Sequence, residues 1–437
     1  SLTTTPADAT VVTATTTSSA QAGNYRINIS QLAQAQTLAS GGYKSSTATI
    51  GTGAKTTISF ALGTVSNGEF GLAGTALANS VRTSGLSAGS VTINGTTIVT
   101  NNATKSARAL ADAINDKTTT TGVSAKASAA TTDKALFSTF GDIDTSGGGS
   151  YTLSVGGVDI AVQGANVAGG AGVTAASLDA ALSGDTAISR ALADANITVT
   201  GTAAGGDLQF SNADGSNVQL TETVTGSVSG GIGNSGSANI GSSVTAVGTI
   251  TLTSADGSPI TVGGSNPAAA GLTAGVGGNY LSADFTADST RTAGNIVIDS
   301  TNNTLQGIMD AINKGNFGVT ASIVSDGSTG SGATPNHLVL TSSATGANST
   351  MKITLSGSGG DPADPDLVKL LGYDPGGAQN LSQKAAAADT KATVNGIAVT
   401  SSGTSIEGAV TGVTFNALKV GSTSVSVSKD SSTLTNS

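Results

Sequence analysis

The chain contains one histidine, His337, and no cysteine, and this limits the chemistry it could perform. A Ser-His-Asp triad needs a histidine beside a nucleophile, and a two-histidine metal site needs a second imidazole. The segment GLSAG at 85–89 has the G-x-S-x-G spacing of a nucleophile elbow. In a chain so rich in Gly and Ser this match is expected by chance, and the segment is predicted to be a turn. His337 is predicted to be a solvated histidine at a strand edge.

Two acidic segments could in principle bind a cation. DIDTSG at 142–147 begins like an EF-hand loop, but the twelfth position is Leu153 in place of the bidentate glutamate that closes such a site. DPADPD at 361–366 precedes LVKLLG at 367–372, and its simplest use is to cap that helix. No phosphate-binding G-x-x-x-x-G-K-[ST] motif is present. The sequence therefore predicts no catalytic residue, no metal site and no cofactor, and an enzyme is not expected.

A repeated ten-residue pattern is more informative than any of these candidate sites. ARALADAIND at 107–116 and LQGIMDAINK at 305–314 match closely, and SRALADANIT at 189–198 is a weaker copy. Apolar residues four positions apart fall on one face of each predicted helix. A strand-like stretch follows each copy, at 122–127, 318–324 and 197–201 respectively. A repeated helix–strand unit indicates that the chain builds an array.

Turn residues mark the elements around each copy. Asn94-Gly95, Gly156-Gly157 and Asn395-Gly396 are the residue pairs that tight hairpins favour. Asn102 or Thr104 is predicted to cap the first helix, and Gly315 to end the helix of the second close match. Further hairpins are predicted at the segments 208–220, 249–262 and 338–355.

Composition supports a structural protein with many strands. Of 437 residues, 61 are Gly and only 3% are aromatic, so the cores must be built from small side chains. The net charge of −9 argues against nucleic-acid binding, which needs clustered Lys and Arg. No apolar run approaches the ~20 residues of a membrane helix, so no membrane insertion is expected. The predicted fold class is mainly β with short helices, an α+β fold of antiparallel sheets and hairpins.

The two ends of the chain resemble each other more than they resemble its middle. Residues 25–32 alternate as a half-buried strand does, and residues 391–428 again read as strands. Residues 1–24 are predicted to be extended or loosely held, and no secretory signal is expected among the first residues. Gly/Ser-rich stretches at 144–150, 226–243 and 263–278 are expected to be domain joints or surface loops.

These patterns predict several domains. An inner discontinuous domain would comprise residues 1–85 and 290–437. Two outer domains, 86–147 and 148–289, would be inserted into it.

Three segments carry a resemblance to a known family. The unit at 304–327 with its closing segment to 355 resembles the insertion repeat of flagellins and flagellar hook-associated proteins. QLAQAQTLAS at 31–40, after the strand YRINI, looks like the N-terminal stretch of the hook-associated protein 2 (filament cap) family, and 367–418 looks like the segment that leads to that family's C-terminal helices. The terminal helical segments of that family are missing, so the chain resembles a fragment of the head region.

The resemblance implies a function at the tip of the bacterial flagellum, outside the cell. The chain would belong to a structural cap that closes the filament and promotes flagellin folding and insertion, with flagellin subunits as partners and a homo-oligomer as the working form. This fragment is expected to be mainly monomeric without the missing helices. Two alternatives stay open: a surface adhesin that binds host mucin or glycan, and a flagellin or hook–filament junction subunit.

Overall fold

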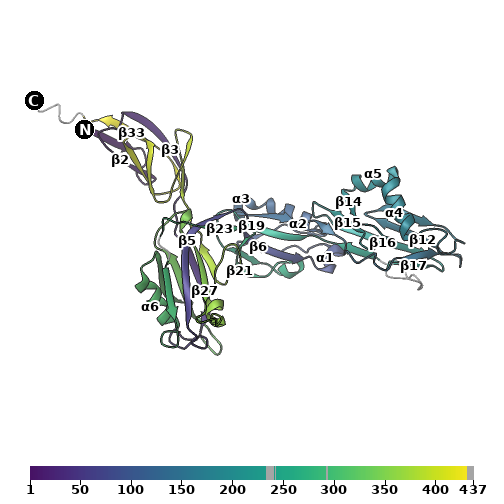
Figure 1. The fold of residues 1–437 in the computed structure, drawn as a ribbon. Coiled ribbons are helices and arrows are strands. Elements are labelled where there is room, and N and C mark those ends of the chain that lie inside the picture. The colour runs from purple at the N-terminus through teal and green to yellow at the C-terminus, as the bar shows by residue number, and fades with distance from the viewer. Residues whose placement is uncertain (233–240, 242, 292–293, 431–437) are drawn as a thin grey trace, which may run out of the picture. The chain divides into compact units, whose positions relative to one another are not determined.

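The computed structural model describes residues 1–232, 241, 243–291 and 294–430, which form two compact units (Figure 1). The first unit comprises residues 1–71, 256–259 and 277–437, and the second comprises 72–255 and 260–276. Antiparallel strands with short helices between them confirm the predicted fold class. The predicted division into three domains, with boundaries after residues 85, 147 and 289, stays a prediction. Among the described residues, no helix has both the length and the apolar character that a membrane span requires.

In the first unit, strands from both chain ends form a two-layered sandwich. The larger sheet has the order β1-β33-β3-β29-β30 and the smaller β2-β32-β31, with a shared hydrophobic core. Residues 1–24 were predicted to be extended or loosely held. They contain the extended strands β1 and β2, and they are not loosely held, because Val12 has no exposed surface. The strands are β1 (Leu2–Pro6), β2 (Val12–Thr16), β3 (Gly23–Gln31), β29 (Thr390–Val394), β30 (Ile397–Ser401), β31 (Ser405–Val410), β32 (Val413–Ala417) and β33 (Gly421–Lys429).

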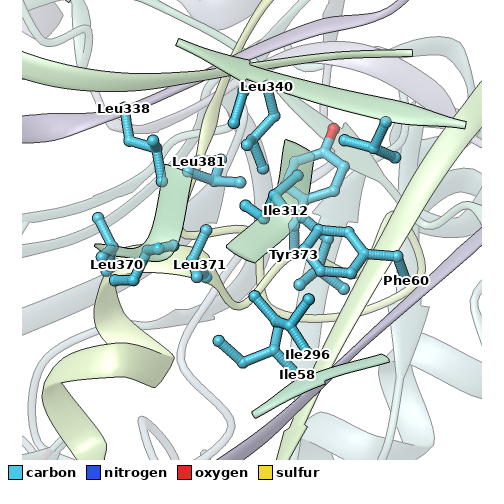
Figure 2. Close-up of a cluster of buried hydrophobic side chains, with 14 of the residues drawn as sticks. Ile58, Phe60, Ile296, Ile312, Leu338, Leu340, Leu370, Leu371, Tyr373 and Leu381 are labelled. Atoms are coloured by element: carbon cyan, nitrogen blue, oxygen red, sulfur yellow. The ribbon is translucent and has the colours of Figure 1, made fainter. Parts of the chain in front are cut away.

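The larger core of the first unit lies between two further sheets and two helices. Strands β23, β24 and β27 pair with the long β5, and a second sheet has the order β25-β26-β4-β28. Figure 2 shows part of this core, where Phe60 and Ile312 lie beside Tyr373. The elements are β4 (Thr37–Tyr43), β5 (Thr56–Ser66), β22 (Asn279–Leu281), β23 (Asp284–Ala287), β24 (Gly294–Ile298), α6 (Leu305–Gly315), β25 (Val319–Ser325), β26 (Asn336–Ser342), η2 (Ala347–Ser349), β27 (Thr350–Ser356), α7 (Pro365–Leu371) and β28 (Ser382–Ala385).

The second unit has two hydrophobic cores. One core collects residues from 77–125 and 250–272, and the other collects residues from 130–246. Around the first lie β6 (Glu69–Ala76), which starts in the first unit, α1 (Asn79–Ser84), β7 (Thr92–Ile93), β8 (Thr96–Thr97), α2 (Ala107–Asn115), α3 (Thr118–Thr121), β9 (Val123–Ala127), β19 (Thr249–Ser254), β20 (Ile260–Gly263), η1 (Pro267–Ala270) and β21 (Gly275–Gly277).

The other core of the second unit is enclosed by the sheet β13-β12-β16-β18, by two smaller sheets and by a pair of helices. Tyr151, at 0% exposure, is its largest fully buried side chain. The elements are β10 (Ala130–Thr131), β11 (Gly141–Asp144), β12 (Ser150–Val155), β13 (Val158–Gln163), α4 (Ala175–Gly184), α5 (Thr186–Asp194), β14 (Ile197–Thr200), β15 (Gln209–Asn212), β16 (Val218–Thr225), β17 (Ser229–Gly231) and β18 (Ser243–Ala246).

All three copies of the predicted helix–strand unit are present, as α2 with β9, α6 with β25, and α5 with β14. Their ends differ in detail from the predictions. Ser106 caps α2 in place of Asn102 or Thr104, because its hydroxyl accepts a hydrogen bond from the backbone N–H of Ala109. Helix α6 does end at Gly315, but the left-handed residue that follows it is Asn316, with φ of 47°.

Predicted hairpins formed only where two residues make the turn. Strands β7–β8, β12–β13 and β29–β30 pair across Asn94-Gly95, Gly156-Gly157 and Asn395-Gly396, all with positive φ. The predicted hairpins at 208–220, 249–262 and 338–355 are wrong. Both strands exist in each segment, but they join different sheets, because their longer connections do not force them to pair.

The Gly/Ser-rich stretches have different positions. Residues 144–150 turn between β11 and β12, and residues 263–278 contain η1, β21 and the return to the first unit after 276. Most of the stretch 226–243 lies outside the described residues.

Candidate functional site

His337 clamps a loop in the first unit. It lies on β26, between β25 and β4, so the predicted position at a strand edge is wrong. The ring Nδ1 is 2.9 Å from the Ser40 carbonyl oxygen, and Nε2 is 3.1 Å from an Asp326 carboxylate oxygen. The side chain is 27% exposed. The ring therefore holds both ends of the loop 326–336 together.

The Ser40 carbonyl and the Asp326 carboxylate beside the ring can only accept hydrogen bonds, and this favours the protonated form of His337. A neutral imidazole has only one N–H, so the doubly protonated cation satisfies both contacts better. The Ser40 carbonyl and then the Asp326 carboxylate raise the pKa of His337. Hydrogen bonds from Ser328 and His337 lower the pKa of Asp326 to about 2. With the ring protonated, this arrangement is an ion pair that closes a loop.

The segment 85–89 is a turn, as predicted. Gly85 ends α1 with φ of 78°, and a Cβ there would lie 2.5 Å from Asn102. Leu86 is buried, and the Ser87 carbonyl accepts a hydrogen bond from the Thr100 hydroxyl. The segment lies in the second unit, whereas His337 lies in the first.

In the acidic segment 142–147, Asp144 stabilises the turn that follows β11. Asp144 accepts hydrogen bonds from the N–H and the hydroxyl of Ser146, at 2.8 and 2.6 Å, and these bonds lower its pKa. Leu153, at the position where a calcium loop needs glutamate, is fully buried in the core. Over the described ranges, no three His, Cys, Asp or Glu side chains gather in a group suited to a metal ion.

Asp364 caps α7, which confirms the predicted use of the acidic segment 361–366. Its Oδ1 accepts from the backbone N–H of Asp366 at 3.1 Å, and its Oδ2 accepts from the N–H of Thr52 at 2.8 Å. The residue is 1% exposed. Buried carboxylates need such partners, because burial penalises an unpaired charge. The contact with Thr52 had no signal in the sequence, because it joins residues that are 312 positions apart.

Two clefts in the first unit are candidates for contact with a ligand. The first has a volume of about 710 Å³, and its lining includes Tyr43, Asp366, Lys369 and Asn380. Burial, followed by the charge of Asp366, raises the pKa of Tyr43. The second cleft, of about 680 Å³, lies on the larger sheet of the sandwich, and its lining includes Asp8 and Arg26. The charged and amide groups that line the two clefts could hydrogen-bond to a ligand.

Comparisons with known proteins agree with the resemblance seen in the sequence. Residues 1–36 match the family model described as Flagellar hook-associated protein 2 N-terminus. The chain is 36% identical over 131 residues to the B-type flagellar hook-associated protein 2 of Pseudomonas aeruginosa, which covers 28% of this chain and 26% of that protein. It is 37% identical over 121 residues to the Xenorhabdus nematophila flagellar hook-associated protein 2, which covers 26% of this chain and 24% of that protein. The chain thus spans about a quarter of the length of these relatives.

Solved structures of flagellar cap proteins also show limited similarity to this chain. The D2-D3 domains of the Escherichia coli flagellar cap protein FliD match 98% of this chain and 100% of that chain, with 15% identity and a TM-score of 0.41. FliD (HAP2) from Pseudomonas aeruginosa PAO1 matches 96% of this chain and 85% of that chain, with 14% identity and a TM-score of 0.30. The family match at residues 1–36 and the sequence relatives show that this chain is similar to flagellar hook-associated protein 2 over part of its length.

Proposed function

We propose that this chain forms part of the structural cap at the distal end of the bacterial flagellar filament, outside the cell. The observation that carries the proposal is the family match at residues 1–36, together with the relatives that share 36–37% of aligned residues. The cap would close the tip and promote the folding and insertion of flagellin, and this action is steric and conformational, with no chemical step.

The architecture supports a frame that carries an inserted unit. Strands β1 and β33 pair over five positions, from Leu2 with Lys429 to Pro6 with Val425, so both ends of the described chain belong to one sheet. The sequence between them can then vary in length without disturbing the frame, because loop closure costs only about 0.6 kcal/mol for each doubling of length. Such a frame suits a part that must stay anchored while its outer unit varies.

Deletion of the full-length gene in its host tests the proposal directly. Cells without a cap should be bald and release monomeric flagellin into the medium, and added full-length protein should restore the filaments. A Val12→Asp variant should fail to restore them, since Val12 is completely buried in the sandwich. A Ser331→Ala variant in an exposed loop is the matched control and should restore them fully. Normal filaments on the deleted cells would contradict the proposal.

The expected partners are flagellin subunits and further copies of the full-length protein. Residues 1–437 by themselves should be mainly monomeric at low concentration, because the helical segments that the family resemblance implies for the full-length protein would supply much of the contact between copies. Light scattering of purified residues 1–437 measures this. A stable ring would contradict this expectation and leave the cap proposal in place.

A surface adhesin that binds mucin or glycan is the second candidate. The cleft at Tyr43 favours it, because an aromatic ring beside a carboxylate and an amide suits a ligand rich in hydroxyl groups. Deleted cells with normal filaments and lost surface attachment would support this candidate. Loss of glycan binding in Tyr43→Ala or Asn380→Ala would locate it in the cleft, and loss only after changes in the loops of the second unit would locate it there.

A flagellin or hook–filament junction subunit is the remaining alternative. The family match at residues 1–36 favours the cap over it. Polymerisation of the full-length protein into long filaments would support the alternative.

A further inference from the structure

Three Asn-Gly pairs occur in the chain, and all three adopt the same left-handed turn. The φ angles are 55° and 63° at Asn67-Gly68, 48° and 78° at Asn94-Gly95, and 49° and 83° at Asn395-Gly396. Asparagine followed by glycine can lose its side-chain amide without an enzyme, because glycine leaves its own backbone nitrogen accessible. The three pairs share sequence and turn type, so differences in their reactivity must come from tertiary contacts.

Two of the three side-chain amides are held through the nitrogen that would leave. Nδ2 of Asn94 donates to the Thr121 carbonyl at 2.8 Å, while its Oδ1 accepts from the N–H of Thr261 at 2.8 Å. Nδ2 of Asn67 donates to a carboxylate oxygen of Asp284 at 2.6 Å. Gly68 is also crowded, because a Cβ there would lie 2.3 Å from the Leu281 carbonyl oxygen. Each contact must be broken before either amide can react.

Asn395 differs from both. Its Oδ1 accepts a hydrogen bond from the N–H of Arg26 at 2.8 Å, which draws electrons from Cγ. Among the described residues its Nδ2 has no hydrogen-bond partner, so the leaving nitrogen is not held. Gly396 is open as well, because no atom lies within 4 Å of the position that a Cβ would take. The electrophilic carbon is activated and the leaving group is unrestrained.

We propose that Asn395 is the site of spontaneous deamidation in this protein. The backbone nitrogen of Gly396 forms a bond to Cγ of Asn395, and the bond from Cγ to Nδ2 breaks. The proton of the attacking nitrogen leaves with the amide as ammonia, and a five-membered succinimide remains. Water then adds across one of the two carbonyl–nitrogen bonds, which gives aspartate or isoaspartate. The reaction needs only water, with no oxidant or reductant.

The product would alter the hairpin that carries it. Val394 and Ile397 are directly paired across this two-residue turn. Isoaspartate adds one carbon to the backbone of a turn that allows no extra length. Either product also places a carboxylate beside the cleft lined by Asp8, Arg26 and Gly396. Modification at this one position would therefore change both the edge hairpin and the charge of the cleft.

Incubation of the purified protein at mildly alkaline pH tests the proposal. Peptides are then followed by mass spectrometry for the mass gain that accompanies replacement of NH₂ by OH. In the folded protein, the peptide with Asn395 should convert about tenfold faster than either of the others. In concentrated urea the three rates should become similar. Faster conversion at Asn67 or Asn94, or equal rates in the folded protein, would overturn the proposal.

A second variant tests the cause of the ranking. Asp284→Ala removes the acceptor that holds Nδ2 of Asn67, so conversion at Asn67 should rise while conversion at Asn395 stays the same. Asp284→Asn keeps an acceptor oxygen and is the matched control. An unchanged rate at Asn67 in the alanine variant, with its circular dichroism spectrum intact, would show that hydrogen bonds to Nδ2 do not explain the order of the three deamidation rates.

Discussion

The first copy of the helix–strand unit (α2 with β9) and the last (α6 with β25) make the same hydrogen bonds between helix and strand, although the segments that connect helix to strand differ in length. In both, an asparagine in the last turn of the helix binds one residue of the following strand twice. Nδ2 and Oδ1 of Asn115 bind the backbone of Ala125, and those of Asn313 bind Ala321, all at 2.7–2.9 Å. Ten residues separate the first pair and eight the second, because α3 is inserted after α2.

We call this double hydrogen bond from the asparagine side chain to the strand backbone the amide clamp, and the middle copy of the unit lacks it. Helix α5 ends at Asp194, and β14 begins at Ile197, the position that aligns with Asn115 in the repeat. Asn196 has φ of 57° and turns the chain directly into the strand. Only Leu192 of α5 is buried, whereas α2 buries four residues. The asparagine contact with the strand therefore tolerates a two-residue insertion and is lost when the asparagine itself is displaced.

The largest expected effect on stability comes from truncating a buried apolar side chain of α2 or α6, the two helices that carry the amide clamp. Ile114→Ala and Ile312→Ala should each lower the free energy of unfolding by about 2–5 kcal/mol, because both side chains are completely buried. Urea unfolding measures the loss, and hydrogen exchange locates it in the unit that was changed. Val99→Ala and Val297→Ala, at exposed positions of the two units, should change stability by less than about 0.5 kcal/mol. Comparable losses at buried and exposed positions would contradict the assignment of these cores.

Removal of the clamp is the sharpest test of the comparison. Asn115→Ala and Asn313→Ala should each cost about 1–3 kcal/mol, because a strand N–H and a carbonyl lose their partners. Hydrogen exchange at the N–H of Ala125 and of Ala321 should accelerate in the respective variant. Asn115→Asp keeps the acceptor for Ala125 and loses the donor, so its effect should be intermediate on exchange at that N–H. Unchanged exchange in both alanine variants would show that the clamp is not what holds the strands.

Helix caps should have smaller and more uniform effects. Ser106→Ala and Thr304→Ala remove the hydroxyls that accept from the N–H of Ala109 and Gly307, and each should cost about 1 kcal/mol. Asp185→Ala removes the cap of the middle copy and should cost about the same, since caps act locally. Thermal unfolding of the three variants measures the costs, with Thr304→Ser as the control that retains the cap. A cost confined to the two clamped copies would mean that capping depends on the clamp.

The smallest effect is a dependence on pH that only one unit should show. The pKa of His337 is raised in the folded state, so its contribution is fully present below the unfolded value of about 6.5 and is lost as pH rises through the folded value. Asp326 acts in the opposite direction: its contribution is present above about 3.8 and is lost as pH falls towards its folded pKa of about 2. The pair is therefore best formed from about pH 4 to 6.

Hydrogen exchange of the loop 326–336 at pH 5.5 and 8 measures this difference. Protection should fall at the higher pH in the native protein and stay constant in His337→Gln. The second unit contains no histidine, so its protection from hydrogen exchange should show no comparable decrease between pH 5.5 and 8. The charge of Lys384 opposes that of the ring, so Lys384→Gln should move the step to higher pH. A step that persists in His337→Gln would exclude this pair as its origin.

Short-range patterns in the sequence predicted much of the local structure. The three helices follow from apolar residues four positions apart, and the three true hairpins follow from Asn-Gly or Gly-Gly pairs. At these three pairs the two-residue turn with positive φ lets the flanking strands pair with the right twist. The same turn at Asn67-Gly68 does not pair its flanking strands, because β5 and β6 join different sheets. The Asp364 cap follows equally from its place before Pro365. A single histidine and the lack of cysteine also narrow the possible chemistry by composition alone.

Only the tertiary structure decided which strands share a sheet and which polar groups meet. The strands at 208–220, 249–262 and 338–355 read as hairpins, but longer connections leave the choice of partner to burial against distant parts of the chain. His337 meets Ser40, and Asp364 meets Thr52, across about 300 residues of sequence. The contrast between Asn395 and Asn94 likewise depends on distant backbone groups. A local pattern determines how a segment folds, whereas its neighbours are fixed only when the whole chain has buried its apolar surface.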